Sequence, residues 1–178
     1  MKIKLFIYSL GAVLMCYSVS YARIKVNRAG DYQCQTQNGL PYCVDKDNRP
    51  LTGKIEHQNS EGVVVKIENY QKGYPSGLTT IFDDKGALLR RTYYKKGIKN
   101  GVDREYHNNR SIKTSATYKN GILNGRVEHY DQDGNLLGRL TYKNGLFEKG
   151  YCIQRTDGKK QKINIQPTGQ KNLISCGG

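Results

Sequence analysis

Glycine and tyrosine recur through the middle of the chain at a fixed interval of 24 residues. Three series keep this interval without a break: Gly53, Gly77, Gly101 and Gly125; Gly73, Gly97, Gly121 and Gly145; and Tyr70, Tyr94, Tyr118 and Tyr142. A fourth series, Gly62, Gly86 and Gly134, is broken where Arg110 occupies the position. Several columns in one register are the signature of a repeat protein, in which each unit packs against its neighbours.

Each 24-residue unit has the pattern of a β-hairpin. After Gly101, residues 102–106 and 112–118 have the composition of two strands, and Asn108-Asn109-Arg110 between them is a turn sequence. Asn120-Gly121 then turns the chain into the next unit. No segment combines helical periodicity with capping residues, so the chain is predicted to be all-β.

Stacked hairpins can share an apolar face that a single hairpin cannot bury. Two apolar columns are available for this packing: Val64, Leu88, Ile112 and Leu136, and Tyr74, Ile98, Ile122 and Leu146. The repeated tyrosines are expected to pack their rings together and leave their hydroxyls in water. Both glycines of each Gly-x-x-x-Gly segment are expected at sharp turns with positive φ. The predicted fold is therefore an elongated, twisted antiparallel sheet of stacked hairpins over residues 51–150, stapled by disulfides.

Residues 1–22 have the features of a secretory signal peptide. Lys2 and Lys4 precede an apolar run, and Ser20-Tyr21-Ala22 offers small residues at the cleavage positions. A permanent membrane anchor is the alternative, although the apolar run is short for a bilayer span. The chain is predicted to be exported, to the periplasm or, as an alternative, to the outside of the cell.

Four cysteines remain after the leader: Cys34, Cys43, Cys152 and Cys176. An even number of cysteines in an exported chain predicts two disulfides. Asn38-Gly39 is the preferred type I′ hairpin turn and places Cys34 opposite Cys43, so Cys152–Cys176 follows by elimination. A metal site is the alternative, but no Cys-x-x-Cys and no cysteine–histidine cluster is present, so no metal is expected.

The segments on either side of the repeats are predicted to close the ends of the array. Residues 23–50 are expected to form an N-terminal hairpin cap, and residues 151–178 a C-terminal cap. Edge strands left open would instead support a dimer, so the oligomeric state is not decided by the sequence.

The motif Tyr-Lys-Asn-Gly-x-x-x-Gly occurs at residues 118–125, and residues 130–136 add a tyrosine, an Asp-Gly turn and a leucine. This pattern resembles the variant MORN repeat of the YwqK-type antitoxin family. The resemblance covers about residues 38–150 and departs at Arg110, at Gln58-Asn59 and at Lys149-Gly150. It implies a binding protein without catalytic residues or a cofactor. An exported member would resemble the periplasmic immunity proteins that neutralise delivered effector toxins, such as type VI phospholipases, by covering the active site.

The residues themselves also argue against an enzyme. His57 and His129 occupy the same repeat position three units apart and are expected on a solvent face, with His107 as the third histidine. Gly-x-Ser-x-Gly, His-Glu-x-x-His and a phosphate-binding Gly-x-x-x-x-Gly-Lys-Ser/Thr are absent from the sequence. Asp83 and Asp131 stand beside turns, where their side chains have a local backbone role.

The formal net charge of +14 is the stronger indication of function. Arginines within strands project from a rigid sheet, and beside tyrosines they are able to hold an acidic surface or a carboxylate-rich cleft. The predicted partner-binding residues are Arg90, Arg91, Tyr93, Arg104, Tyr106, Arg126, Tyr130 and Arg139. A solvated face without a partner is the alternative.

The expected partner is an acidic protein toxin. An anionic lipid, lipopolysaccharide or glycan of the cell envelope is the alternative ligand, and nucleic acid is a weaker third because an exported protein rarely meets it.

Overall fold

The computed structural model describes residues 26–27, 31–154 and 157–163, and these contain strands and turns but no helix. The predicted all-β fold is therefore confirmed for this part of the chain. The predicted leader (residues 1–22) and Cys176 lie outside the described residues. The strands are β1 (Val26–Asn27), β2 (Tyr32–Gln37), β3 (Leu40–Asp45), β4 (Gly53–Gln58), β5 (Val64–Gln71), β6 (Tyr74–Pro75), β7 (Gly77–Phe82), β8 (Leu88–Lys95), β9 (Ile98–Tyr106), β10 (Ile112–Lys119), β11 (Ile122–Tyr130), β12 (Leu136–Lys143), β13 (Leu146–Ile153) and β14 (Lys160–Ile163).

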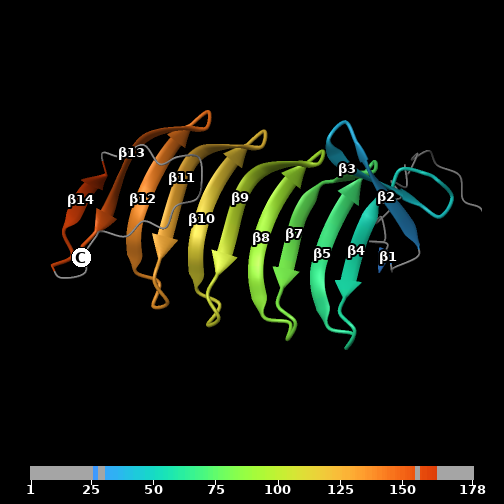
Figure 1. Ribbon diagram of the computed structural model, residues 1–178, viewed down its shortest axis with the longest axis horizontal. Coiled ribbons are helices and arrows are strands. Elements are labelled where there is room, and N and C mark those ends of the chain that lie inside the picture. The colour runs from blue at the N-terminus through green and yellow to red at the C-terminus, as the bar shows by residue number, and fades with distance from the viewer. Residues whose placement is uncertain (1–25, 28–30, 155–156, 164–178) are drawn as a thin grey trace, which may run out of the picture.

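Twelve of these strands form one open, elongated sheet (Figure 1). From β4 to β14 its strands follow the order of the chain, with the two-residue β6 pairing beside the main path with β5. All pairings in this sheet are antiparallel except β1 with β4. Strands β2 and β3 form a separate hairpin. The stacked-hairpin prediction is confirmed by this simple up-and-down order.

The glycine and tyrosine columns of the sequence meet as cross-strand pairs. Each repeated tyrosine lies opposite one glycine of the series that begins at Gly53. The four pairs are Gly53 with Tyr70, Gly77 with Tyr94, Gly101 with Tyr118, and Gly125 with Tyr142. The 24-residue period therefore corresponds to one pair of strands in the sheet.

The two glycine series have different roles. Asn120 and Gly121, with φ angles of 50° and 85°, form the two central positions of a tight turn between β10 and β11. Gly101, with φ 123°, lies instead inside β9, where the register against β8 shifts. A Cβ at Gly101 would stand 3.1 Å from Cβ of Tyr93. The expectation that both glycines sit at sharp turns was therefore wrong for Gly101 and Gly125, which lie inside strands where the register shifts, as at a β-bulge.

Backbone hydrogen bonds at the turns join each repeat to the one before it. The N–H of the turn glycine donates at 2.8 Å to a carbonyl of the preceding repeat, and the donor–acceptor pairs are Gly73 to Leu51, Gly97 to Pro75, Gly121 to Lys99 and Gly145 to Leu123. The apolar side chains beside these turns are only partly covered, since Ile122 is 46% and Leu146 73% exposed. This second apolar column therefore forms a rim and not the buried core that the sequence suggested.

The hairpin β2–β3 lies at the β4 end of the sheet (Figure 1). Cys34 and Cys43 are opposite each other and form the predicted disulfide. Cys43 is buried with Leu51, Ile55 and Tyr70, and its N–H donates to the carbonyl of Gly73 at 2.8 Å. The second predicted bridge involves Cys176, which lies outside the described residues.

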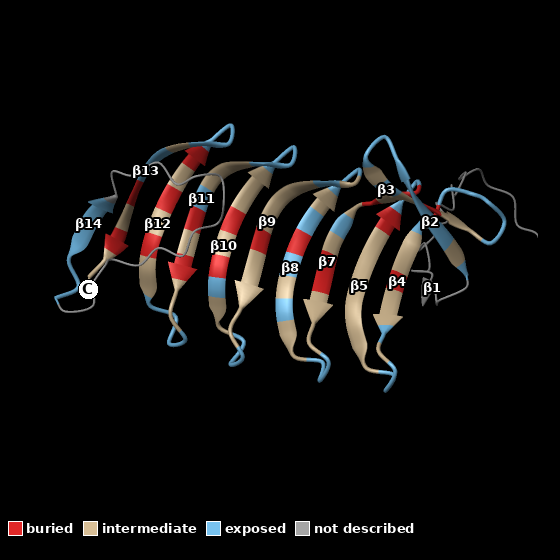
Figure 2. Ribbon diagram, in the orientation of Figure 1, coloured by how far each residue is buried: buried red, intermediate tan, exposed pale blue. Residues whose placement is uncertain are grey.

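Buried residues run as a band across the middle of the strands (Figure 2). At the β10–β13 end, this band contains Ala116, Val127, Leu140 and Tyr142. Tyr70 and Tyr142 are buried, and burial raises the pKa of both phenols. The rings of these two tyrosines therefore pack in the two core clusters, as the repeated pattern predicted.

Candidate binding face

The two faces of the sheet differ in chemistry. Because side chains alternate along a strand, cross-strand partners project from the same face. One face, here called the core face, carries the row Thr92, Asp103, Ala116, Val127 and Leu140. The other, here called the basic face, carries the row Arg91, Arg104, Ser115, Glu128, Arg139, Tyr151 and Lys162.

An ion cluster occupies the core face around Asp103, whose side chain is 1% exposed. Arg90 binds both carboxylate oxygens of Asp103, and its Nε donates to Oδ1 at 2.8 Å. Thr92 Oγ1 donates to Oδ1 at 2.9 Å, and Lys99 Nζ to Oδ2 at 3.1 Å. The hydrogen bonding with Asp103 raises the pKa of the Arg90 guanidinium. This arrangement satisfies a buried carboxylate, so its evident role is structural.

Five of the eight predicted partner-binding residues share the basic face: Arg91, Tyr93, Arg104, Arg126 and Arg139. Tyr130 joins them, because its hydroxyl donates to Oε2 of Glu128 at 3.0 Å. Tyr106 ends β9, two residues after Arg104, as Tyr130 ends β11 two residues after Glu128. Arg90 is separated from this set, since it belongs to the ion cluster on the core face.

Glu128 is the acid within this basic row, and it is already engaged. Arg139 Nη2 lies 2.7 Å from Oε1 of Glu128, and Nε donates to the same oxygen at 2.8 Å. Burial, and then the hydrogen bond to Glu128, raises the pKa of Tyr130. The acid therefore positions Arg139 and Tyr130 but does not neutralise the other cations of the face.

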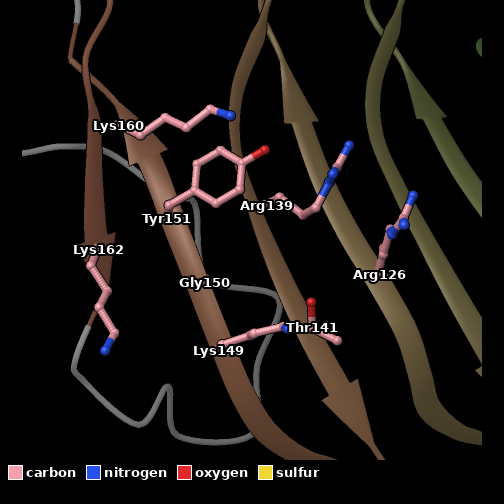
Figure 3. A pocket seen from close by; sticks show the side chains of 8 residues that line it. All are labelled: Arg126, Arg139, Thr141, Lys149, Gly150, Tyr151, Lys160 and Lys162. Carbon is pink, nitrogen blue, oxygen red and sulfur yellow. The ribbon is translucent and has the colours of Figure 1, made fainter.

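A groove of about 480 Å³ lies on the basic face at its β11–β14 end (Figure 3). Its walls carry five cationic side chains and no acid, and its lining residues are Arg126, Arg139, Thr141, Lys149, Gly150, Tyr151, Lys160 and Lys162. Lys160 Nζ lies 4.9 Å from the centre of the Tyr151 ring. The three lysines were not among the residues predicted from the sequence, although the strand register extended beyond Tyr142 leads to Lys149.

The histidines and aspartates considered as candidate catalytic residues are dispersed in the described part of the chain. His57 Nε2 donates a hydrogen bond to Oε2 of Glu68 at 2.9 Å. His129, by contrast, is 6% exposed, and its Nδ1 lies 3.3 Å from Oγ1 of Thr114. The solvent-face expectation was therefore wrong for His129. Asp83 and Asp131 accept hydrogen bonds from backbone N–H groups of their own turns, as predicted.

Among the same residues, no group of three or more histidine, cysteine, aspartate or glutamate side chains is placed to hold a metal ion. No helix there is long and apolar enough to cross a membrane.

Comparison with known proteins adds little. No protein-family model matches the chain, and no curated protein matches it in sequence. One similar solved structure is alternansucrase in complex with isomaltononaose, at 17% sequence identity and a TM-score of 0.21. The match covers 74% of this chain and 12% of that chain. At this TM-score the similarity supports no conclusion about function.

Proposed function

We propose that this protein is a non-catalytic binding scaffold that holds an acidic protein partner on its basic face, and that it acts as a periplasmic immunity protein. The partner would be a secreted effector toxin whose active site is covered by the sheet. The sequence resemblance to the YwqK-type antitoxin family motivates the choice of partner.

The proposal rests on one observation: cations on the core face are paired with acids, whereas several cations on the basic face are not. Arg90 and Lys99 on the core face are both paired with Asp103, and Arg90 also contacts Glu105. On the basic face, by contrast, Arg91 and Arg104 are direct cross-strand neighbours, and neither forms an ion pair within the described part of the chain. Adjacent like charges are destabilising, so an acidic partner would relieve this repulsion and be attracted over a long range.

A second candidate is an envelope-binding module that recognises an anionic lipid, lipopolysaccharide or glycan. The groove favours it, because five cations around one concave site also suit a phosphorylated small ligand. The two candidate functions differ in the ligand that the basic face binds, which is a protein in the first and a lipid or glycan in the second.

Affinity capture distinguishes them. The full chain is immobilised at moderate salt and exposed to secreted and envelope proteins, lipids and glycans. We expect one acidic protein to be retained, and we expect its enzymatic activity to fall on binding. If only lipid or glycan is retained, the immunity proposal fails and the envelope candidate stands.

Charge variants test whether the basic face is responsible. Arg91→Gln with Arg104→Gln should weaken capture and reduce its salt dependence. The matched control, Lys85→Gln with Lys119→Gln, removes the same charge from outside the arginine row and the groove, and should bind normally. Equal loss in both pairs would mean that net charge, and not the arginine row, drives capture.

A further inference from the structure

The cations of the groove are arranged in levels along the strand direction. Arg126 and Lys149 lie on either side of Thr141 as its cross-strand partners, and they form the first level. Arg139 and Lys162 lie on either side of Tyr151 as its cross-strand partners, and they form the second level. Lys160, two residues before Lys162 in β14 and opposite Ile153, forms the third. Successive levels are therefore about 6.8 Å apart, the distance between every second residue of a strand.

Four of these five cations have no internal counter-ion. Within the described part of the chain, no acid lies within ion-pair distance of Arg126, Lys149, Lys160 or Lys162, and all four are exposed. Arg139 alone is paired, with Glu128. Each of the three levels thus presents at least one cation that is available to a ligand.

We infer that the groove binds an extended acidic segment of a protein partner, with carboxylate side chains at alternate positions. In an extended segment, every second side chain projects to the same side at about 6.8 Å intervals, which equals the spacing of the levels. A helical segment would place same-face carboxylates three or four residues apart instead. This inference deepens the proposed function, on which it rests, by naming the part of the partner that is recognised.

The floor of the groove suits an extended backbone. Thr141 offers a hydroxyl, and Gly150, which is buried, adds no side chain between the two cationic walls (Figure 3). The Tyr151 ring contacts Lys160 and offers an apolar surface to the residues between the carboxylates. Arg126 can bind a carboxylate in a bidentate manner, and the lysines act as compact charges.

Two synthetic hexapeptides of identical composition test the spacing. One is Thr-Asp-Thr-Asp-Thr-Asp, and the other has its three aspartates in succession. Binding to the full chain is measured by calorimetry at low and at moderate salt. We expect the alternating peptide to bind about tenfold more tightly. Equal affinities would overturn the inference, and so would a clear preference for inorganic tripolyphosphate over the alternating peptide.

Variants assign the effect to the groove. Lys149→Gln with Lys162→Gln should remove the preference for the alternating peptide, whereas Lys85→Gln with Lys119→Gln should retain it. If the groove variant still captures the protein toxin at full affinity, the inference falls and the proposed function stands. If the peptide preference is present but no protein partner is captured, the proposed function falls and the groove specificity stands.

Discussion

Arg90 Nε donates to Oδ1 of Asp103 at 2.8 Å across two strands that belong to consecutive repeats. Asp103 is almost completely buried, although it lies in an open sheet whose strands follow one another in a single row. The pair therefore joins one repeat to the next by side chains, in addition to the backbone ladder.

Asp103→Asn should destabilise the protein by about 3 kcal/mol, because it leaves Arg90 and Lys99 without their shared acid in a buried site. Urea denaturation measures the change. The control is Glu105→Gln, which removes a looser contact with Arg90 at 3.6 Å and should cost less than about 1 kcal/mol. Similar losses for both variants would argue against a special role for Asp103.

Arg110→Gly should stabilise the protein by about 0.5–1 kcal/mol. Arg110 has a φ of 67°, in the left-handed region where the other repeats place Gly62, Gly86 and Gly134. The reciprocal variant Gly134→Arg should cost about 1–2 kcal/mol, because a Cβ at Gly134 meets no atom within 4 Å and only the backbone conformation is affected. Thermal unfolding of the two variants should therefore shift in opposite directions, and shifts of the same sign would contradict this explanation.

Alkaline pH should unfold the sheet because the repeated tyrosines are deprotonated more readily in the unfolded chain. Burial raises the pKa of Tyr70, Tyr94 and Tyr142 above the ordinary value of 10.0. Because the folded state disfavours the phenolate, stability is unaffected below pH 10 and falls as the pH rises from there toward the raised pKa values. Circular dichroism against pH should show this loss.

Tyr70→Phe removes one of these groups and should move the alkaline midpoint to higher pH. The control Tyr93→Phe changes a tyrosine that is 45% exposed on the basic face, and should leave the midpoint in place. An unchanged midpoint in Tyr70→Phe would show that other groups govern alkaline unfolding.

The sequence predicted the features that follow from the repeat period and from the sequences of the tight turns. Asn120-Gly121 identified the turn, the 24-residue columns identified the stacking, and Asn38-Gly39 identified the Cys34–Cys43 pair. Gly101 was misplaced because a glycine at a bulge and a glycine at a turn share the same positive φ.

The candidate site was only partly predictable for a related reason. Arg90 and Arg91 are adjacent in sequence, so they project from opposite faces, and only the strand register decides which of them meets Asp103. The groove lysines lie where the repeat pattern ends, since Lys149-Gly150 replaces the expected glycine spacing. Lys162 lies beyond the last repeat, so no column in the sequence pointed to it.

Chemical footprinting of lysines, with and without the captured acidic partner, tests most directly which face binds. The groove presents Lys149, Lys160 and Lys162, whereas Lys66 and Lys99 lie on the core face. If the basic face holds the partner, the amine-reactive label should be lost from the three groove lysines and retained at Lys66. Protection of Lys66 and Lys99 with unchanged labelling of the groove would contradict the account.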